Sequence, residues 1–187
     1  MSDEERAVLD YFPEIGQIAD GNRRAQVLAV WTRMLEESGF DALTDVPIAP
    51  HLAYSQFRHN RAILEMALAV AEVLERYHGV AIDRDDLLSV ALLQDVSKLV
   101  EFEPDGAGAR LSPIGQQLRH PVYGVHAALA AGCPVHVAQG ILEHSPKNPR
   151  VPPQLVTSIL YFLDRLDMMA VRESVGGGDH PERQPAD

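Results

Sequence analysis

Residues 92 to 99 read Leu-Leu-Gln-Asp-Val-Ser-Lys-Leu, a largely apolar segment whose spacing predicts a buried helix. This helix is expected to begin after Asp83, a good N-cap, and to run to about residue 102. Asp95 lies inside it, and an ionised carboxylate is costly to bury unless it is paired or bound to a metal ion. Because apolar residues have helical spacing in nearly all of the chain, the sequence predicts an all-α fold.

The remaining chain divides into helices separated by short breaks. Further helices are expected over residues 3–11, 22–38, 52–77, 112–118, 121–131, 134–143 and 154–173. Segments rich in proline or glycine predict loops at 41–50, 103–110 and 145–153, and no strand pair is expected. We expect an N-terminal helical extension over 1–50, a main helical domain over 51–175 and a disordered tail over 176–187.

Composition narrows the classes of protein to consider. The chain has 187 residues, 46% of them hydrophobic, and a single cysteine, Cys133, which excludes an internal disulfide and a cysteine-based zinc site. A net charge of −11 argues against a nucleic-acid partner, which needs a positive surface. No apolar run reaches the roughly 18 residues of a membrane span, so no membrane partner is expected. The acidic N-terminus lacks the features of a signal peptide, so a cytoplasmic location is expected.

Several histidines and aspartates occur inside or beside apolar helical segments, where such side chains need a partner. They are His59, Asp95, His120, His144 and Asp164. One interpretation is two ordinary ion pairs, in which Asp95 pairs with Lys98 and Asp164 with a nearby arginine. The other is a metal centre in the core of a helical bundle. Imidazole with carboxylate suits Mn, Fe, Co, Ni or Zn, as one or two ions, with Mg as a further candidate.

Five pieces of sequence in a fixed order resemble the HD superfamily of metal-dependent phosphohydrolases. They are His59 in Arg-His-Asn-Arg, Asp95 in the opening segment, His120-Pro-Val-Tyr-Gly-Val-His, Ile141-Leu-Glu-His-Ser and Tyr161-Phe-Leu-Asp-Arg-Leu-Asp. The resemblance covers about residues 54–171 and implies an HD-type helical bundle, with residues 51–175 as its metal-binding domain.

The resemblance also implies a set of metal ligands. His59, Asp95 and Asp164 correspond to the ligands of the first metal, and His120 and His144 to those of a second metal, with Asp95 bridging the two. In hydrolytic members, the lysine that matches Lys98 lies where it can touch the substrate phosphate. Asp95 and Lys98 are therefore the candidate catalytic residues, although Lys98 could instead pair with Asp95 or Glu101 on the helix surface.

Gln94 stands where the family has a histidine, and an amide oxygen is a poor substitute for imidazole at a transition metal. Three outcomes are open. Gln94 or water fills the position, only the second metal is bound, or the chain has lost catalysis and kept the fold.

A small anionic substrate would need cationic and hydrogen-bonding side chains around the metal. The candidates for these contacts are Arg58, Arg61, Arg119, Tyr123 and Lys147. The N-terminal helices, with Trp31 on their apolar stripe, are expected either to pack on the bundle or to form a homodimer contact.

Three functions follow from this pattern. The first is a hydrolase of a phosphorylated small metabolite or nucleotide, in which a metal polarises the phosphoryl oxygen and activates water. The second, implied by another branch of the same superfamily, is a di-iron oxygenase that cleaves a small organic or phosphonate substrate. The third is a non-catalytic metal- or ligand-binding module.

Overall fold

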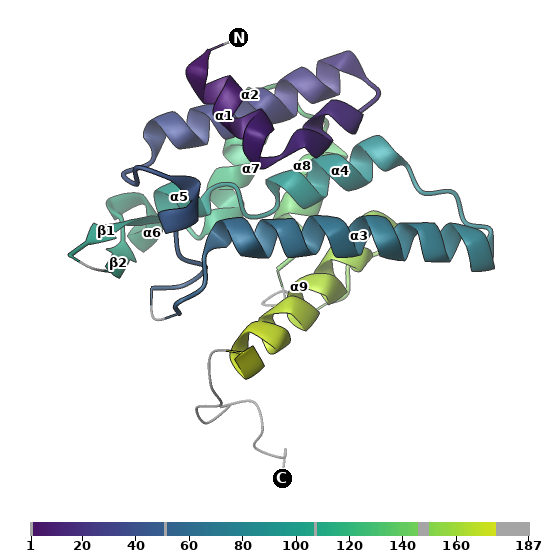
Figure 1. Ribbon diagram of the computed structural model, residues 1–187. Helices are drawn as coiled ribbons and strands as arrows, with labels where there is room; N and C mark the ends of the chain where they lie inside the picture. The colour runs from purple at the N-terminus through teal and green to yellow at the C-terminus, as the bar shows by residue number, and fades with distance from the viewer. Residues whose placement is uncertain (1, 51, 107, 146–149, 175–187) are drawn as a thin grey trace.

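The computed structural model describes residues 2–50, 52–106, 108–145 and 150–174, and these are mostly helical with one small two-stranded hairpin (Figure 1). In chain order the elements are α1 (Asp3–Tyr11), the 3-10 helix η1 (Pro13–Gln17), α2 (Gly21–Glu37), η2 (Leu43–Asp45), α3 (Gln56–His78), α4 (Arg84–Leu93), α5 (Lys98–Glu101), β1 (Phe102–Asp105), β2 (Gly108–Leu111), α6 (Pro113–Gln117), α7 (His120–Ala130), α8 (Val135–Glu143) and α9 (Leu155–Ser174). The helical prediction is therefore confirmed for most of the chain. Lys147 and the tail predicted over 176–187 lie outside the described residues.

Local sequence signals define most helix ends. Ser2 and Glu5 form a capping box on α1, and Asp20 and Ser55 cap α2 and α3 through their side-chain oxygens. Asp83 accepts from the Asp86 N–H and starts α4 where the sequence predicts it. These caps satisfy amide groups that the first helical turn leaves without a partner.

Helix α4 is the central helix of the protein. Every residue from Leu87 to Leu93 is buried, and α2, α3, α8 and α9 all pack against it. Helix α8 comes especially close, because a Cβ on Gly140 would lie 2.7 Å from Val90. A helix that is apolar on all sides needs neighbours on all sides. The end of α4 is therefore surrounded by several other elements.

The N-terminal helices pack on the bundle, which is one of the two placements expected for them. Trp31 on α2 is fully buried, and its ring lies 4.7 Å from that of Phe12 between centroids. Both belong to the same hydrophobic core as Leu92 and Ile141 of the main bundle. Figure 1 shows α1 and α2 as a layer that covers α4 on the side away from α3.

The prediction of one continuous helix from Asp83 to about residue 102 is wrong, because α4 ends at Leu93 and α5 begins only at Lys98. Residues 94–97 form a turn, so Asp95 lies at a break and not inside a helix. The Ser97 hydroxyl donates to the carbonyl of His120 on α7. This bond connects the turn to α7, and tertiary contacts override the helical preference of the sequence here.

The expected loop over 103–110 is also wrong, because β1 and β2 form an antiparallel hairpin in which Phe102 pairs with Leu111. Glu103 and Arg110 face each other across it and form an ion pair at 2.7 Å. Gly106 has a φ of +59°, a conformation that glycine adopts readily, and it follows Asp105. Because Asp105 pairs with Gly108, Gly106 is the first residue of the connection, a position at which short hairpin turns favour glycine.

Within the part of the chain that the structure describes, none of the helices is both long enough and apolar enough to cross a membrane.

Candidate metal centre

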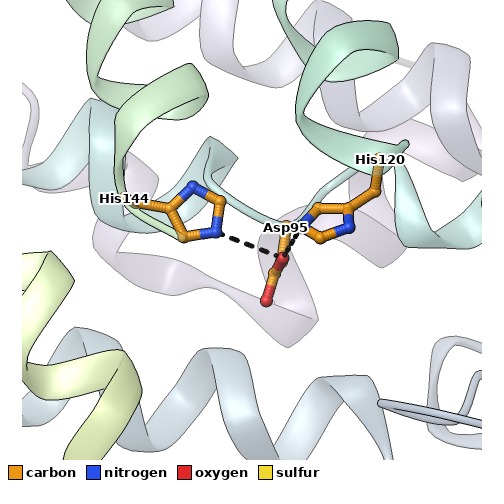
Figure 2. A group of neighbouring side chains, drawn as sticks. All are labelled: Asp95, His120 and His144. Atoms are coloured by element: carbon orange, nitrogen blue, oxygen red, sulfur yellow. Dashed lines mark ion pairs between the residues drawn. The ribbon is translucent and has the colours of Figure 1, made fainter. Parts of the chain in front are cut away.

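Asp95 lies among three imidazoles, which come from α3, from α7 and from the residue that follows α8. Its Oδ1 is 3.0 Å from Nε2 of His120 on α7 and 3.5 Å from Nε2 of His144, which follows α8. Figure 2 shows the two rings on either side of this carboxylate oxygen. The other oxygen, Oδ2, is 3.1 Å from Nε2 of His59 on α3. The break after α4 thus points the carboxylate into the space between α3, α7 and α8.

Two groups of possible metal ligands share this carboxylate. The first is His59, Asp95 and Asp164, and the second is Asp95, His120 and His144. Within each group the candidate ligand atoms all lie within 4.8 Å of one another. Asp164 joins from α9, where its Oδ1 is 3.3 Å from Nε2 of His59. The structure therefore brings together all five residues predicted from the sequence, in two groups that could each hold a metal ion.

Each imidazole is held through its Nδ1 atom, which leaves Nε2 directed at Asp95. The His59 Nδ1 is 2.7 Å from Oδ2 of Asp167. The His120 Nδ1 is 3.3 Å from Oε2 of Glu101. The His144 Nδ1 is 2.7 Å from the Ile141 carbonyl oxygen, which can only accept, so this nitrogen carries the proton. Histidines that bind metals are commonly oriented in this way by a carboxylate or a carbonyl.

Several polar atoms at the centre are buried without a hydrogen-bond partner among the described residues. They are Nε2 of His59 and of His120, Oδ1 of Asp95, and both side-chain amide atoms of Gln94. The short distances between the imidazole nitrogens and Asp95 do not have hydrogen-bond geometry, although the atoms face one another. Buried polar atoms are nearly always satisfied in native proteins. A cation among these atoms would satisfy them, so the residues present fit a metal ion.

The electrostatics of the centre favour positive charge. Burial opposes ionisation of Asp95, yet the charges of Lys98 and His120 hold the pKa of its carboxyl well below the usual value. Burial also opposes protonation of His59 and His144, but contacts with the surrounding carboxylates raise the pKa of both imidazoles, that of His59 strongly. In the metal-free protein, protons on these histidines supply the positive charge. A bound divalent cation would supply it instead.

Sequence reasoning missed two residues that support Asp95 from α3. Gln56 Nε2 donates to Oδ2 of Asp95 at 3.3 Å and to Oδ1 of Asn60 at 2.7 Å. Both amides are buried, and they share a helix face with His59. A signal was present, since three polar residues at positions i, i+3 and i+4 on a buried helix face are unusual.

Lys98 lies close enough to influence Asp95, but it forms its hydrogen bond elsewhere. Its Nζ donates to the Ile48 carbonyl at 3.1 Å and lies 5.8 Å from the centre of the Phe102 ring. Its positive charge contributes to the lowered pKa of Asp95. Glu101, the alternative partner on the helix surface, instead contacts His120.

Two predicted substrate contacts lie on α3, on either side of His59. Arg58 is exposed, and its guanidinium lies 5.7 Å from the ring centre of Tyr54. Arg61 is paired with two carboxylates, with Glu14 at 2.6 Å and Glu65 at 3.1 Å. These bonds connect α3 to η1 and to the next turn of α3.

Two more predicted contacts lie near His120. Arg119 is exposed at the N-cap of α7. The hydroxyl of Tyr123 donates to Oε2 of Glu37 on α2 at 2.6 Å, so in this structure it is bonded to α2 and not directed at a substrate position. Lys147, the last predicted contact, cannot be placed relative to these side chains, because it is outside the described ranges.

Access to the centre differs between the imidazoles. The side chain of His120 is 12% exposed, whereas those of His59 and His144 are fully enclosed. A separate open cleft of about 310 Å³, lined by residues such as Ile82 and His136, includes none of the five ligand candidates. The described part of the centre therefore reaches solvent at His120 and also at Asp164, whose side chain is 9% exposed.

Comparisons with known proteins identify no relative: the chain matches no protein-family model, no curated protein and no solved structure.

Proposed function

We propose that this protein is a metal-dependent hydrolase with a dinuclear centre, similar to the HD superfamily and acting on a small phosphorylated metabolite or nucleotide. The observation that carries the proposal is the position of Asp95, whose two carboxylate oxygens face two different groups of ligands. Asp95 would then contribute a ligand atom to each of two cations. Two-metal sites of this kind are common in enzymes that cleave phosphate esters.

The two groups offer different donor atoms. Asp95, His120 and His144 supply two nitrogens and one oxygen, a set that suits Fe, Co, Ni or Zn. His59, Asp95 and Asp164 supply one nitrogen and two oxygens, which suits Mn or Mg better. In our proposal the second, nitrogen-rich group binds its ion more tightly. Gln94, beside Asp95 and with an unsatisfied amide oxygen, adds a further oxygen ligand to the first group.

The chain's own residues would support the reaction by charge and orientation. Metal ions in such a centre polarise a phosphoryl oxygen and lower the pKa of water. Lys98 places a positive charge beside the centre, where it can stabilise charge that develops on a phosphate. Glu101 and Asp167 keep the rings of His120 and His59 in the orientation that presents Nε2.

The substrate class rests on the opening of the centre. The partly exposed imidazole of His120 marks the side from which a substrate would enter, and Arg119 lies next to it on the surface. A compact anion such as a phosphate ester fits this arrangement better than a polymer, because the net charge of −11 disfavours nucleic acids.

The test begins with metal analysis of purified protein, followed by chelation and titration with Mn²⁺, Zn²⁺, Co²⁺, Ni²⁺ and Fe²⁺. Reloaded protein is then assayed for phosphate release from a panel of nucleotides and sugar phosphates. We expect two ions per chain in the wild type and one in His120→Ala, with loss of phosphate release. The matched control is His136→Ala, since His136 is a surface histidine bonded to Asp86 and belongs to neither group.

Two results would contradict the hydrolase. Protein that binds no metal, and whose melting temperature does not respond to any of the five ions, would leave only a non-catalytic module. Co-purified iron with an EPR signal, and oxygen consumption in place of phosphate release, would favour the oxygenase.

A further inference from the structure

The indole of Trp31 is bonded to the backbone at the break that carries Asp95. Its Nε1 donates to the carbonyl oxygen of Leu92 at 3.1 Å, in a buried contact between α2 and the end of α4. In a continuous helix this carbonyl would accept from the amide of Val96, four residues later. Here the Val96 amide instead donates to Leu93 at 3.2 Å. The indole N–H thus occupies the place that the next helical bond would take.

We infer that Trp31 is a positioning residue for the proposed metal centre, acting through the Leu92 carbonyl to hold Asp95 between the histidines. The inference rests on the proposed metal-binding function. Its physical basis is a competition between two backbone arrangements. With the indole in place, the Leu92 carbonyl is satisfied and α4 can end. Without it, this buried carbonyl finds a donor only if the helix continues to Val96.

Continuation of the helix would move the carboxylate. Asp95 lies between Leu92 and Val96, so regular helical geometry at these positions would turn its side chain relative to α3, α7 and α8. The Nε2 atoms of His59 and His120 face different oxygens of Asp95, and the Nδ1 atoms of the two rings contact Asp167 and Glu101. They cannot follow the carboxylate without losing these contacts. Metal affinity is therefore expected to depend on the Trp31 bond.

The ordinary interpretation of Trp31 is hydrophobic packing, since it is fully buried and its ring contacts Phe12. Packing and hydrogen bonding can be separated experimentally. Trp31→Phe keeps an aromatic ring in the core and removes the N–H donor. Met34→Ala is the matched control, because Met34 is also fully buried on α2 and has no polar atom that could hold the break.

The first experiment is calorimetric titration of metal-depleted protein with Zn²⁺ and with Mn²⁺, at a temperature where all variants are folded. We expect Trp31→Phe to weaken metal binding about tenfold, equivalent to about 1.4 kcal/mol. Met34→Ala should lower the melting temperature but leave the metal dissociation constant unchanged within error. Unchanged metal affinity in Trp31→Phe, or equal weakening in both variants, would overturn the inference.

The second experiment uses wild-type protein and therefore does not depend on the folding of a variant. Trp31 is the single tryptophan of the chain, so its indole N–H gives one isolated resonance in a proton–nitrogen correlation spectrum. Titration with diamagnetic Zn²⁺ should shift this resonance, because metal binding at Asp95 should restrict the backbone turn that follows the Leu92 carbonyl, to which the indole is bonded. Backbone resonances that respond while the indole stays fixed would refute the role of Trp31. A spectrum that does not respond at all would remove the metal site itself, and the inference with it.

Discussion

Asp167→Asn tests how far the proposed metal binding depends on a residue outside both groups of candidate ligands. Asp167 Oδ2 lies 2.7 Å from Nδ1 of His59, and both side chains are buried. The carboxylate can only accept, so it requires the proton of His59 on Nδ1 and leaves Nε2 free to bind a cation. The amide of Asn can donate instead, which permits the opposite tautomer. The substitution also removes a negative charge beside the imidazole.

The expected loss can be estimated from this geometry. Removal of a side chain that orients a metal ligand costs about 10 to 100-fold in metal affinity, equivalent to about 1.4 to 2.7 kcal/mol. At a fixed excess of metal, the stabilisation of the folded state by binding falls by the same amount. For a chain of this size, about 1 kcal/mol corresponds to roughly 2 to 4 °C. The melting-temperature increase caused by metal should therefore shrink by about 3 to 10 °C in Asp167→Asn.

Differential scanning fluorimetry with and without Mn²⁺ or Zn²⁺ measures this difference, and competition with a chelator gives the affinities directly. Asp86→Asn is the control, since Asp86 is a partly buried carboxylate bonded to Arg23 and His136 and belongs to neither ligand group. It should lower the melting temperature of the metal-free protein without changing the metal-dependent increase. The reasoning is refuted if Asp167→Asn binds metal as tightly as the wild type while His59→Ala does not.

Three other perturbations test separate parts of the centre. In Gly115→Ala the new Cβ would lie 2.1 Å from the carbonyl oxygen of Glu101, so α6 must shift, and we expect calorimetry to show about 1 to 3 kcal/mol of destabilisation together with weaker metal binding. Gln94→His places imidazole where two amide atoms are buried and unsatisfied, so titration should show tighter binding of the first metal; unchanged affinity would mean that Gln94 does not face the ion. The pKa values of His59 and His144 are raised in the metal-free protein, so their stabilising contribution is full below the unfolded histidine pKa of about 6.5 and is lost as the pH rises through their folded values. Metal binding must displace those protons, and the metal-dependent rise in melting temperature should therefore grow with pH. A rise that is independent of pH would contradict protonated imidazoles in the metal-free protein.

The helices and the ligand candidates could be predicted from the sequence because both depend on local pattern. Apolar spacing and caps such as Asp83 predict most helix ends within a few residues, although not the end of α4. His59, Asp95 and Asp164 stand out because a titratable side chain on an apolar helix face requires a partner. The local pattern shows that these side chains need hydrogen-bond or metal partners, but not which residues or ions those partners are.

The supporting residues could not be predicted in the same way. In the sequence Asp167 lies three residues after Asp164, and Glu101 lies three residues after Lys98. In the structure they instead contact His59 and His120, which belong to distant elements. Such roles depend on where helices meet in space. The break after Leu93 was missed for a related reason, since the groups that stabilise it belong to Trp31 on α2 and to the His120 carbonyl on α7. The sequence of residues 92–99 alone contains no signal that would end the helix after Leu93.

The polar centre is difficult to explain as a device for stability. It encloses carboxylates and imidazoles at the end of α4, in which every residue from Leu87 to Leu93 is buried. Apolar residues of similar volume would pack there at no electrostatic cost. Asp95 also uses its two oxygens in two directions, which an ordinary ion pair would not require. Three imidazoles anchored through Nδ1, with Nε2 atoms converging on one carboxylate, leave a shortage of positive charge. A divalent cation would correct that shortage without requiring protonated histidines, which agrees with two groups of residues that could each hold a metal ion.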